Sequence, residues 1–271
     1  MKEVKASANV MKEKNNYQTA PEFQELENWV ANLRVEFAQT GQTIFKSRNE
    51  VKIFGKGDRI LNVKSFKFPN LVNRFVYVYF RGSKAARSFA YAEKLLKLGV
   101  PTPQPVAYAE YIRSGVLKES YYVSLHFKYD FTLREVLNYQ ISERDRILRQ
   151  WVAFTFEKLH KNGIFHLDYS PGNTLIRHDG DEYFFSLIDL NRMNFGEIDF
   201  EKGLQNFRQL DTDRQTLELL ATEYALLNEK DPGLAMKKLL ALDQKNKNYR
   251  HRKMKWKSAF RKLIRFGRAS E

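Results

Sequence analysis

Residues 166–173 of this chain read HLDYSPGN and place a histidine, an aspartate and an asparagine at a fixed spacing, as His166, Asp168 and Asn173. Beyond a short turn, an apolar run ends at a further aspartate, Asp189. That run has the length and composition of a buried strand. A loop rich in turn residues, followed by a strand that ends in an acid, constrains the fold more than any other feature here.

The residue types in this pattern are those that phosphoryl transfer from ATP requires. A carboxylate orients the acceptor hydroxyl and takes its proton, and an amide oxygen five residues later binds a magnesium ion beside the phosphates. A further carboxylate for magnesium is expected on the next hairpin, where Asp189 lies. The pattern predicts a kinase-like catalytic core that uses ATP and Mg²⁺.

Asp, Pro, Gly and Asn are also ordinary turn residues, so the motif alone is compatible with a plain surface loop. Its flanks favour the catalytic interpretation. Upstream, apolar residues between Leu148 and Leu159 recur at helical spacing. Downstream, residues 174–177 and 184–188 flank a turn and predict a hairpin. Helix, loop, hairpin and acid in this order are difficult to obtain by chance.

Composition excludes several classes of protein. The 271 residues suffice for one large domain or two lobes around a cleft, and 43% hydrophobic residues allow a core. There is no cysteine, which excludes disulfides, thiolate metal sites and cysteine nucleophiles. The longest apolar run, residues 75–80, has strand length rather than the ~20 residues of a membrane span. The N-terminus lacks an apolar signal region, so we expect a cytoplasmic protein.

The order of expected elements is that of a two-lobed protein kinase, an α+β fold with a small β-rich lobe followed by a larger, mostly helical one. Residues 1–20 are polar and are expected to be frayed. Helices are expected at residues 22–37 and 84–98, and strands at 43–46, 50–54, 60–66, 106–112 and 120–126. The predicted domains are an N-terminal, partly helical extension (1–40), an N-lobe (41–128), a C-lobe with the catalytic loop (129–243) and a basic tail (244–271).

Lys64 is the candidate for the phosphate-binding lysine of the small lobe. It lies within an apolar strand, where a charge is costly unless a partner or ligand compensates it. Strand alternation is equally compatible with a solvent-facing Lys64. Glu93 is the only acid between Arg59 and Ala109 and is therefore the candidate partner. Its alternative role is a solvated helix glutamate that pairs with Lys97 at i,i+4.

The loop that should cover the phosphates contains no glycine. A protein kinase has G-x-G-x-x-G between its first two strands, whereas this chain has Ser47, Arg48 and Asn49 at that turn. Backbone amides of the turn are predicted to cap phosphates, with Arg48 adding charge. An ordinary exposed hairpin arginine is the alternative.

Three further segments carry a resemblance to a known family. Residues 63–70 (VKSFKFPN), 83–89 (SKAARSF) and 102–108 (TPQPVAY) are similar to the lipopolysaccharide kinase family, which phosphorylates Kdo or heptose in the inner core of bacterial lipopolysaccharide. The similarity runs from about Thr43 to Tyr224. The catalytic motif itself also occurs across eukaryotic-like kinases and antibiotic phosphotransferases.

The resemblance implies a role for each matching residue. Asp168 would be the catalytic base, and Asn173 and Asp189 the magnesium ligands. Lys64 would hold the α- and β-phosphates of ATP, and His166 would support the catalytic loop.

Departures from protein kinases restrict the substrate class. Leu167 replaces the arginine that commonly couples catalysis to a phosphorylated activation loop, and Asp189-Leu190-Asn191 replaces D-F-G. No A-P-E follows. We therefore expect neither this phosphorylation control nor good activity on peptides.

The net charge of +14 is concentrated at the C-terminus. Outside residues 245–268, 35 Lys and Arg stand against 32 Asp and Glu. Trp256, Phe260, Leu263 and Ile264 would share one helical face, which suits an anionic membrane surface. Packing on the large lobe is one alternative, and RNA binding is a less favoured one. The eleven basic residues of the tail are Lys245, Lys247, Arg250, Arg252, Lys253, Lys255, Lys257, Arg261, Lys262, Arg265 and Arg268.

The leading hypothesis is an ATP-dependent kinase that phosphorylates a Kdo or heptose hydroxyl on lipid A, peripheral on the inner face of the inner membrane. Its partners would be a lipid-linked sugar and anionic lipid, and no obligate protein partner is evident. An anionic acceptor would require arginines such as Arg192 and Arg208.

Three alternatives remain at this stage. They are an aminoglycoside- or choline-type kinase, a small atypical kinase that binds RNA, and a non-catalytic ATP-binding scaffold. The first would require an acidic acceptor pocket, for which the candidate residues are Asp199, Glu201, Asp211 and Asp213.

Overall fold

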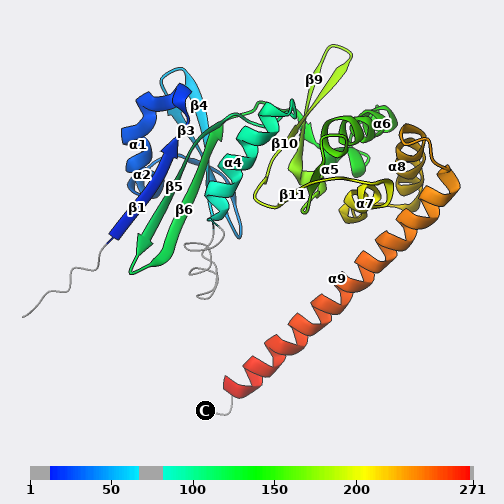
Figure 1. Cartoon of the computed structure of the whole chain (residues 1–271). Coiled ribbons are helices and arrows are strands. Elements are labelled where there is room, and N and C mark those ends of the chain that lie inside the picture. The colour runs from blue at the N-terminus through cyan, green and yellow to red at the C-terminus, as the bar shows by residue number, and fades with distance from the viewer. Residues whose placement is uncertain (1–12, 67–81, 269–271) are drawn as a thin grey trace, which may run out of the picture. The chain divides into compact units, whose positions relative to one another are not determined.

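The computed structural model describes the backbone of residues 13–66 and 82–268, and side chains as far as Trp256 with Ser258. The described residues form two compact units (Figure 1). The first unit consists of the chain up to Lys128 together with the short segment Ile188–Asn191. The second unit consists of Tyr129–Leu187 and the chain from Arg192 onward. The apolar run at residues 75–80 lies outside the described residues.

The first unit is built on a six-stranded antiparallel sheet with the order β1-β5-β6-β4-β3-β2 (Figure 1). All five strands expected from the sequence are present, with ends that differ by a few residues. The strands are β1 (Glu13–Thr19), β2 (Gln42–Lys46), β3 (Glu50–Lys56), β4 (Arg59–Ser65), β5 (Pro105–Arg113) and β6 (Val116–Leu125).

The expectation of a frayed N-terminus is wrong for residues 13–19. These residues form β1, which pairs with β5 from Glu13↔Arg113 to Thr19↔Ala107. β1 is an edge strand, and most of its described side chains are exposed or half-buried. Because its stabilisation comes from backbone hydrogen bonds, its sequence lacks the apolar alternation that identifies a strand.

The single helix expected at residues 22–37 is three short segments, η1 (Pro21–Leu26), α1 (Glu27–Ala31) and α2 (Leu33–Gln39). The break lies at Asn32, whose φ of −99° and ψ of 11° are not helical. Its side-chain amide donates instead to the Asn28 carbonyl at 2.9 Å. Asparagine commonly competes with the helix backbone in this way.

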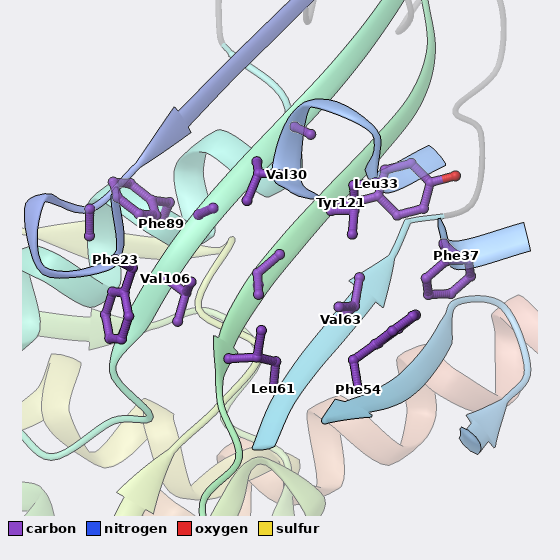
Figure 2. Packing of buried hydrophobic residues seen from close by; sticks show 14 of the residues in the cluster. Phe23, Val30, Leu33, Phe37, Phe54, Leu61, Val63, Phe89, Val106 and Tyr121 are labelled. Atoms are coloured by element: carbon purple, nitrogen blue, oxygen red, sulfur yellow. The ribbon is translucent and has the colours of Figure 1, made fainter. Parts of the chain in front are cut away.

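These segments pack on one face of the sheet and complete its core (Figure 2). The Phe37 ring lies 5.2 Å from that of Tyr121 and 6.3 Å from that of Phe54. Val30 and Leu33 are fully buried in the same cluster. The predicted N-terminal extension is thus an integral layer of the first unit.

Helix α4 (Lys84–Lys97) contacts β5 and β6 and agrees with the helix predicted at residues 84–98 (Figure 1). Ser83 caps its N-terminus by accepting from the Ala86 amide at 3.1 Å. The Phe89 ring packs 5.6 Å from Tyr108 of β5. Successive strand residues point to opposite faces, so Tyr108 and its cross-strand neighbour Tyr122 point to the α4 side, and Tyr121 points to the other.

The second unit is mostly helical and carries the catalytic loop between short strands (Figure 1). Its sheets have the orders β10-β9-β7 and β11-β8. Its elements are β7 (Phe131–Thr132), α5 (Leu133–Leu137), α6 (Arg144–Phe154), the π-helical turn η3 (Thr155–His160), β8 (Ile164–His166), η4 (Pro171–Asn173), β9 (Thr174–Asp179), β10 (Glu182–Leu187), β11 (Met193–Phe195), α7 (Phe200–Leu204), η5 (Gln205–Gln209), α8 (Arg214–Leu227) and α9 (Pro232–Arg268).

The basic segment is not a separate tail beginning at residue 244. It continues α9, one 37-residue helix whose first part packs on α8 and η5 (Figure 1). The Asn246 amide donates to the Arg208 carbonyl at 2.9 Å, and the Lys247 ammonium pairs with Asp243 at 2.7 Å. All described side chains from Asn248 onward are exposed, and Trp256 is 72% exposed. The predicted apolar face at Phe260, Leu263 and Ile264 lies outside the described side chains.

Among the described helices, none combines the length and apolarity needed to cross a membrane.

Candidate active site

The HLDYSPGN loop leaves the buried strand β8 at His166, which is fully buried. β8 pairs with β11, with His166 opposite Met193. The Asn206 side chain of η5 donates to the His166 carbonyl at 2.8 Å, and Gln209 donates to the Leu167 carbonyl at 3.1 Å. Two side chains from η5 therefore fix the backbone on which the loop begins.

Backbone hydrogen bonds hold Asp168 in place. Its amide donates to Nδ1 of His166 at 3.1 Å, and its carbonyl accepts from the Asn173 side chain and the Ser170 amide, both at 2.8 Å. The Asp168 carboxylate is 39% exposed and lies 3.5 Å from the Arg192 guanidinium. The loop thus presents a carboxylate whose position does not depend on the contacts of its own oxygens.

An aromatic stack connects the catalytic loop to the π-helical turn η3. The Tyr169 ring stacks on Trp151 with centroids 5.2 Å apart, and its hydroxyl lies 2.8 Å from Thr155 Oγ1. Trp151 in turn donates to Thr174 at 3.3 Å. All four residues are buried. π-helical turns are frequent at functional sites, and this one places Thr155 under the loop.

The buried His160 contacts η5 through Asn206. His160 lies 2.7 Å from the Tyr224 hydroxyl through Nδ1 and 2.9 Å from Asn206 Oδ1 through Nε2. Burial lowers the pKa of His160 from 6.5 to about 4, against a smaller raising effect of the Asn206 hydrogen bond. His160 is therefore neutral in the folded protein at neutral pH.

We expect this histidine to make folding stability sensitive to acid. The unfolded chain binds the proton near pH 6.5 and the folded chain only near pH 4, so the contribution is complete above pH 6.5 and is lost as the pH falls toward 4. The loss amounts to about 3 kcal/mol at most. Urea unfolding of the His160→Gln variant should show a shallower dependence between those pH values, with the exposed His251→Gln as control. An unchanged slope would contradict the assignment.

Asp189 lies in the first unit at a strained backbone position. Its φ is +60°, an uncommon value for a residue other than glycine. Its Oδ1 accepts from the Asn191 side chain at 2.6 Å and pairs with the Lys64 ammonium at 2.8 Å. Backbone strain of this kind clusters at functional sites, and here it positions a carboxylate against the predicted phosphate-binding lysine.

Lys64 points to the face of the sheet that α4 covers, because its cross-strand neighbour is Tyr122. Its side chain is 20% exposed, so the solvent-facing alternative does not apply. Among the described ion pairs, Lys64 pairs with Asp189 and none joins it to Glu93. Glu93 instead lies close to Tyr122, whose pKa is raised by burial and then by the charge of Glu93.

A second lysine, Lys84, lies beside Lys64 at the start of α4. The Lys64 and Lys84 ammonium groups lie 5.4 and 6.0 Å from the centroid of the same Phe66 ring. Burial lowers the pKa of Lys84, and Arg48, Arg87 and Lys64 lower it further, while Asp189 raises it. Cations at a helix N-terminus are unfavourable unless an anion joins them, so this cluster suits a polyphosphate.

The β2–β3 turn contributes to this cluster through its charge. Arg48 is exposed and close enough to Lys84 to lower the pKa of that lysine, as the sequence-based interpretation requires. The Ser47 amide donates to the Asn49 carbonyl at 3.0 Å and so closes the turn. Ser47 is therefore not a phosphate donor through its amide in this arrangement, and Arg48 is the strongest candidate of the three turn residues.

The oxygen donors fit magnesium. Within the described part of the chain, no group of three or more His, Asp or Glu converges as a metal cage. Magnesium is usually held by one or two carboxylates together with phosphate oxygens and water. Asp189 offers the carboxylate. The Asn173 side chain uses its Nδ2 to donate to the Asp168 carbonyl at 2.8 Å, which leaves its amide oxygen as the second candidate donor.

Sequence reasoning missed Lys84 and Arg87 as members of the cationic cluster, although both lie in the segment that carries the family resemblance. It also missed Asn191, Asn206 and Gln209, which position the catalytic residues. A cation in the first turn of a helix was the available signal for Lys84. The residues that support the loop from η5 gave none, because they act across about 40 positions of sequence.

Comparison with known families decides the identity. The model of the lipopolysaccharide kinase (Kdo/WaaP) family matches residues 70–229, more than half of the chain. The chain belongs to this family. The resemblance inferred from the three sequence segments is thereby confirmed, and the protein is a kinase of the lipopolysaccharide core.

One solved structure supports the fold of this kinase. WaaP in complex with acyl carrier protein matches with a TM-score of 0.55 and 17% identity, over 85% of this chain and 97% of that chain. The Rio2 kinase-ADP/Mg²⁺-phosphoaspartate complex from Chaetomium thermophilum matches at a TM-score of 0.46 and 15% identity, over 80% and 67%. A search of curated proteins finds no significant match. The predicted protein-kinase-like α+β fold is confirmed.

Proposed function

We propose that this kinase transfers the γ-phosphoryl group of Mg²⁺-ATP to a Kdo or heptose hydroxyl of the lipopolysaccharide inner core. The observation that carries the proposal is the Asp168 carboxylate, exposed on a loop whose backbone is fixed by His166, Ser170 and Asn173. A general base requires this combination of a fixed position and an accessible oxygen.

Asp168 and the cations of the first unit take roles that their surroundings support. Asp168 accepts the proton of the acceptor hydroxyl, and the Arg192 guanidinium, 3.5 Å from that carboxylate, stabilises its charge. Lys64, Lys84 and Arg48 provide positive charge for the phosphates of ATP. Phosphoryl transfer depends mainly on such positioning and charge stabilisation, because the protein itself forms little covalent chemistry.

Magnesium would be held by Asp189 and Asn173 together with phosphate oxygens. When bound, it neutralises the charge that develops on the transferred phosphoryl group. The Lys64–Asp189 pair implies that Lys64 must exchange this carboxylate for phosphate oxygens when the nucleotide binds.

The acidic residues suggested for a cationic acceptor already have structural roles. Asp199 and Asp213 cap the N-termini of α7 and α8. Glu201 pairs with Lys238, and Asp211 pairs with Arg250 at 3.0 Å. These contacts argue against an aminoglycoside- or choline-type acceptor and favour an anionic one.

The experiment that tests the proposed function is magnesium-dependent ATP turnover with a panel of acceptors. A Kdo-bearing lipid A precursor and a heptose-bearing core should be phosphorylated, while an aminoglycoside, choline and a peptide should not. Mass spectrometry of the product locates the phosphate on the sugar. Phosphorylation of the aminoglycoside or choline alone would overturn the proposal.

We further propose that the distal part of α9 holds the kinase on an anionic membrane surface, on the inner face of the inner membrane. Met254, Lys255 and Trp256 are all exposed there. A basic residue near such a surface contributes about 1 kcal/mol. RNA binding is the alternative that the same charges allow.

Deletion of residues 255–271 should abolish sedimentation with anionic liposomes, because it removes Trp256 and six Lys and Arg. The deletion retains Asn246 and Lys247, which hold the first part of α9 against the rest of the second unit. Turnover of a deacylated acceptor should be unchanged, which controls for folding. Full-length protein should sediment less at high salt. Equal sedimentation with neutral and anionic liposomes would refute membrane binding by charge.

A further inference from the structure

A cavity of about 500 Å³ lies beside the catalytic loop within the second unit. Ser170 and Pro171 of the loop form one side, α5 contributes Arg134, and α9 contributes Tyr249 and Arg250 among others. The Ser170 amide donates to the Asp168 carbonyl at 2.8 Å. The cavity therefore begins two residues from the catalytic carboxylate, and its volume falls in the range of small-molecule sites.

The charge of this cavity is predominantly positive. Its lining includes three cationic side chains, Arg134, Arg250 and Lys253, and one acidic side chain, Asp211. Asp211 pairs with Arg250 at 3.0 Å and therefore orients that guanidinium while neutralising part of its charge. Both partners of this pair are about half exposed, so an incoming anion can reach the guanidinium. Arginine and lysine together suit a carboxylate or a phosphate.

The cations on α9 are held in position by contacts with the rest of the unit. One helical turn before Arg250, Asn246 donates to the Arg208 carbonyl at 2.9 Å and Lys247 donates to the Thr212 carbonyl at 3.4 Å. Gln209, which also lines the cavity, donates to the Leu167 carbonyl. The segment from η5 to Thr212 thus joins α9 to the catalytic loop, and the cations keep a fixed relation to Asp168.

We propose that this cavity is an acceptor subsite that binds an anionic group of the saccharide, a carboxylate or a phosphate ester, while the hydroxyl to be phosphorylated lies at Asp168. The inference rests on the proposed function and adds a recognition element to it. The helix that carries the basic segment would then serve substrate selection with its proximal part. The exposed ring of Tyr249, next to the Lys253 ammonium at 5.7 Å, adds an apolar surface for the sugar.

Steady-state kinetics on a deacylated, Kdo-bearing acceptor test the proposal without interference from membranes. Arg250→Gln and Lys253→Gln should each raise the acceptor KM about tenfold or more, because each removes a charge-assisted contact. The KM for ATP and kcat should stay near wild type. Arg252→Gln, on the same helix but outside the cavity lining, is the matched control and should behave as wild type.

Two chemically altered acceptors identify the anion. A carboxyl-reduced saccharide and a dephosphorylated saccharide should differ in their binding to wild type. The recognised group is the one whose removal weakens binding to wild type to the level at which the variants bind the native acceptor. Unchanged acceptor KM in both variants, with normal wild-type turnover, would overturn the subsite.

Absence of wild-type turnover would instead count against the proposed function. Calorimetric binding of the same saccharide then tests the cavity directly. Binding that weakens in both variants supports the subsite, whereas equal binding to wild type and variants, or none to wild type, refutes it. Lys253→Gln breaks no ion pair among the described residues, so it separates loss of recognition from loss of folding.

Discussion

Asp168→Asn should reduce turnover by about 10²–10⁴-fold while ATP binds as tightly as in wild type. The substitution preserves shape and removes the group that accepts the proton. The loop should keep its geometry, because the hydrogen bonds to His166, Ser170 and Asn173 all use the backbone of Asp168. Single-turnover phosphorylation and calorimetric ATP titration measure the two quantities separately.

Asp181→Asn, on the β9–β10 turn, is the matched control and should leave both quantities unchanged. Near-normal turnover of Asp168→Asn would remove Asp168 from the role of general base. A variant that also fails to bind ATP would mean that the carboxylate contributes to the nucleotide site, so the division of roles between the acceptor and phosphate sides would be wrong.

The catalytic loop and the family could be predicted because their signals are local. His166, Asp168 and Asn173 lie within eight residues, and the structure shows that two of the hydrogen bonds fixing the loop join these three residues to one another. Strands β2–β6 and helix α4 have apolar periodicity and clear turn residues at their ends. Such elements can be predicted from the local sequence alone.

The parts that could not be predicted depend on distant neighbours. β1 forms a strand because it pairs with β5, which lies about 90 positions later in the sequence. Lys64 forms its ion pair with Asp189, 125 positions later. The basic segment has the composition of an independent tail, yet Asn246 and Lys247 fix its first part to η5 and to the residues that directly follow η5. Composition reports the charge of a segment and not the surface against which it packs.

The Lys64–Asp189 pair predicts the direction in which Asp189→Asn changes ATP binding with and without magnesium. Asp189→Asn should abolish the additional stabilisation that magnesium gives in the presence of ATP, and it should reduce turnover at least about 100-fold, because the metal loses its carboxylate. Asparagine tolerates the positive φ at this position and retains a side-chain oxygen for the Asn191 hydrogen bond. The folded state should therefore survive the substitution.

Thermal-shift titrations with ATP, in magnesium and in EDTA, distinguish this assignment from a purely structural role. In EDTA the variant should bind ATP at least as well as wild type, since Lys64 no longer has a carboxylate partner that competes with the phosphates. In magnesium it should gain nothing further, whereas wild type and Asp181→Asn should. A magnesium-dependent shift equal to that of wild type would exclude Asp189 as a metal ligand. Weaker ATP binding in EDTA would show that Asp189 holds Lys64 in place for the phosphates, which makes the pair a positioning device instead of a competitor.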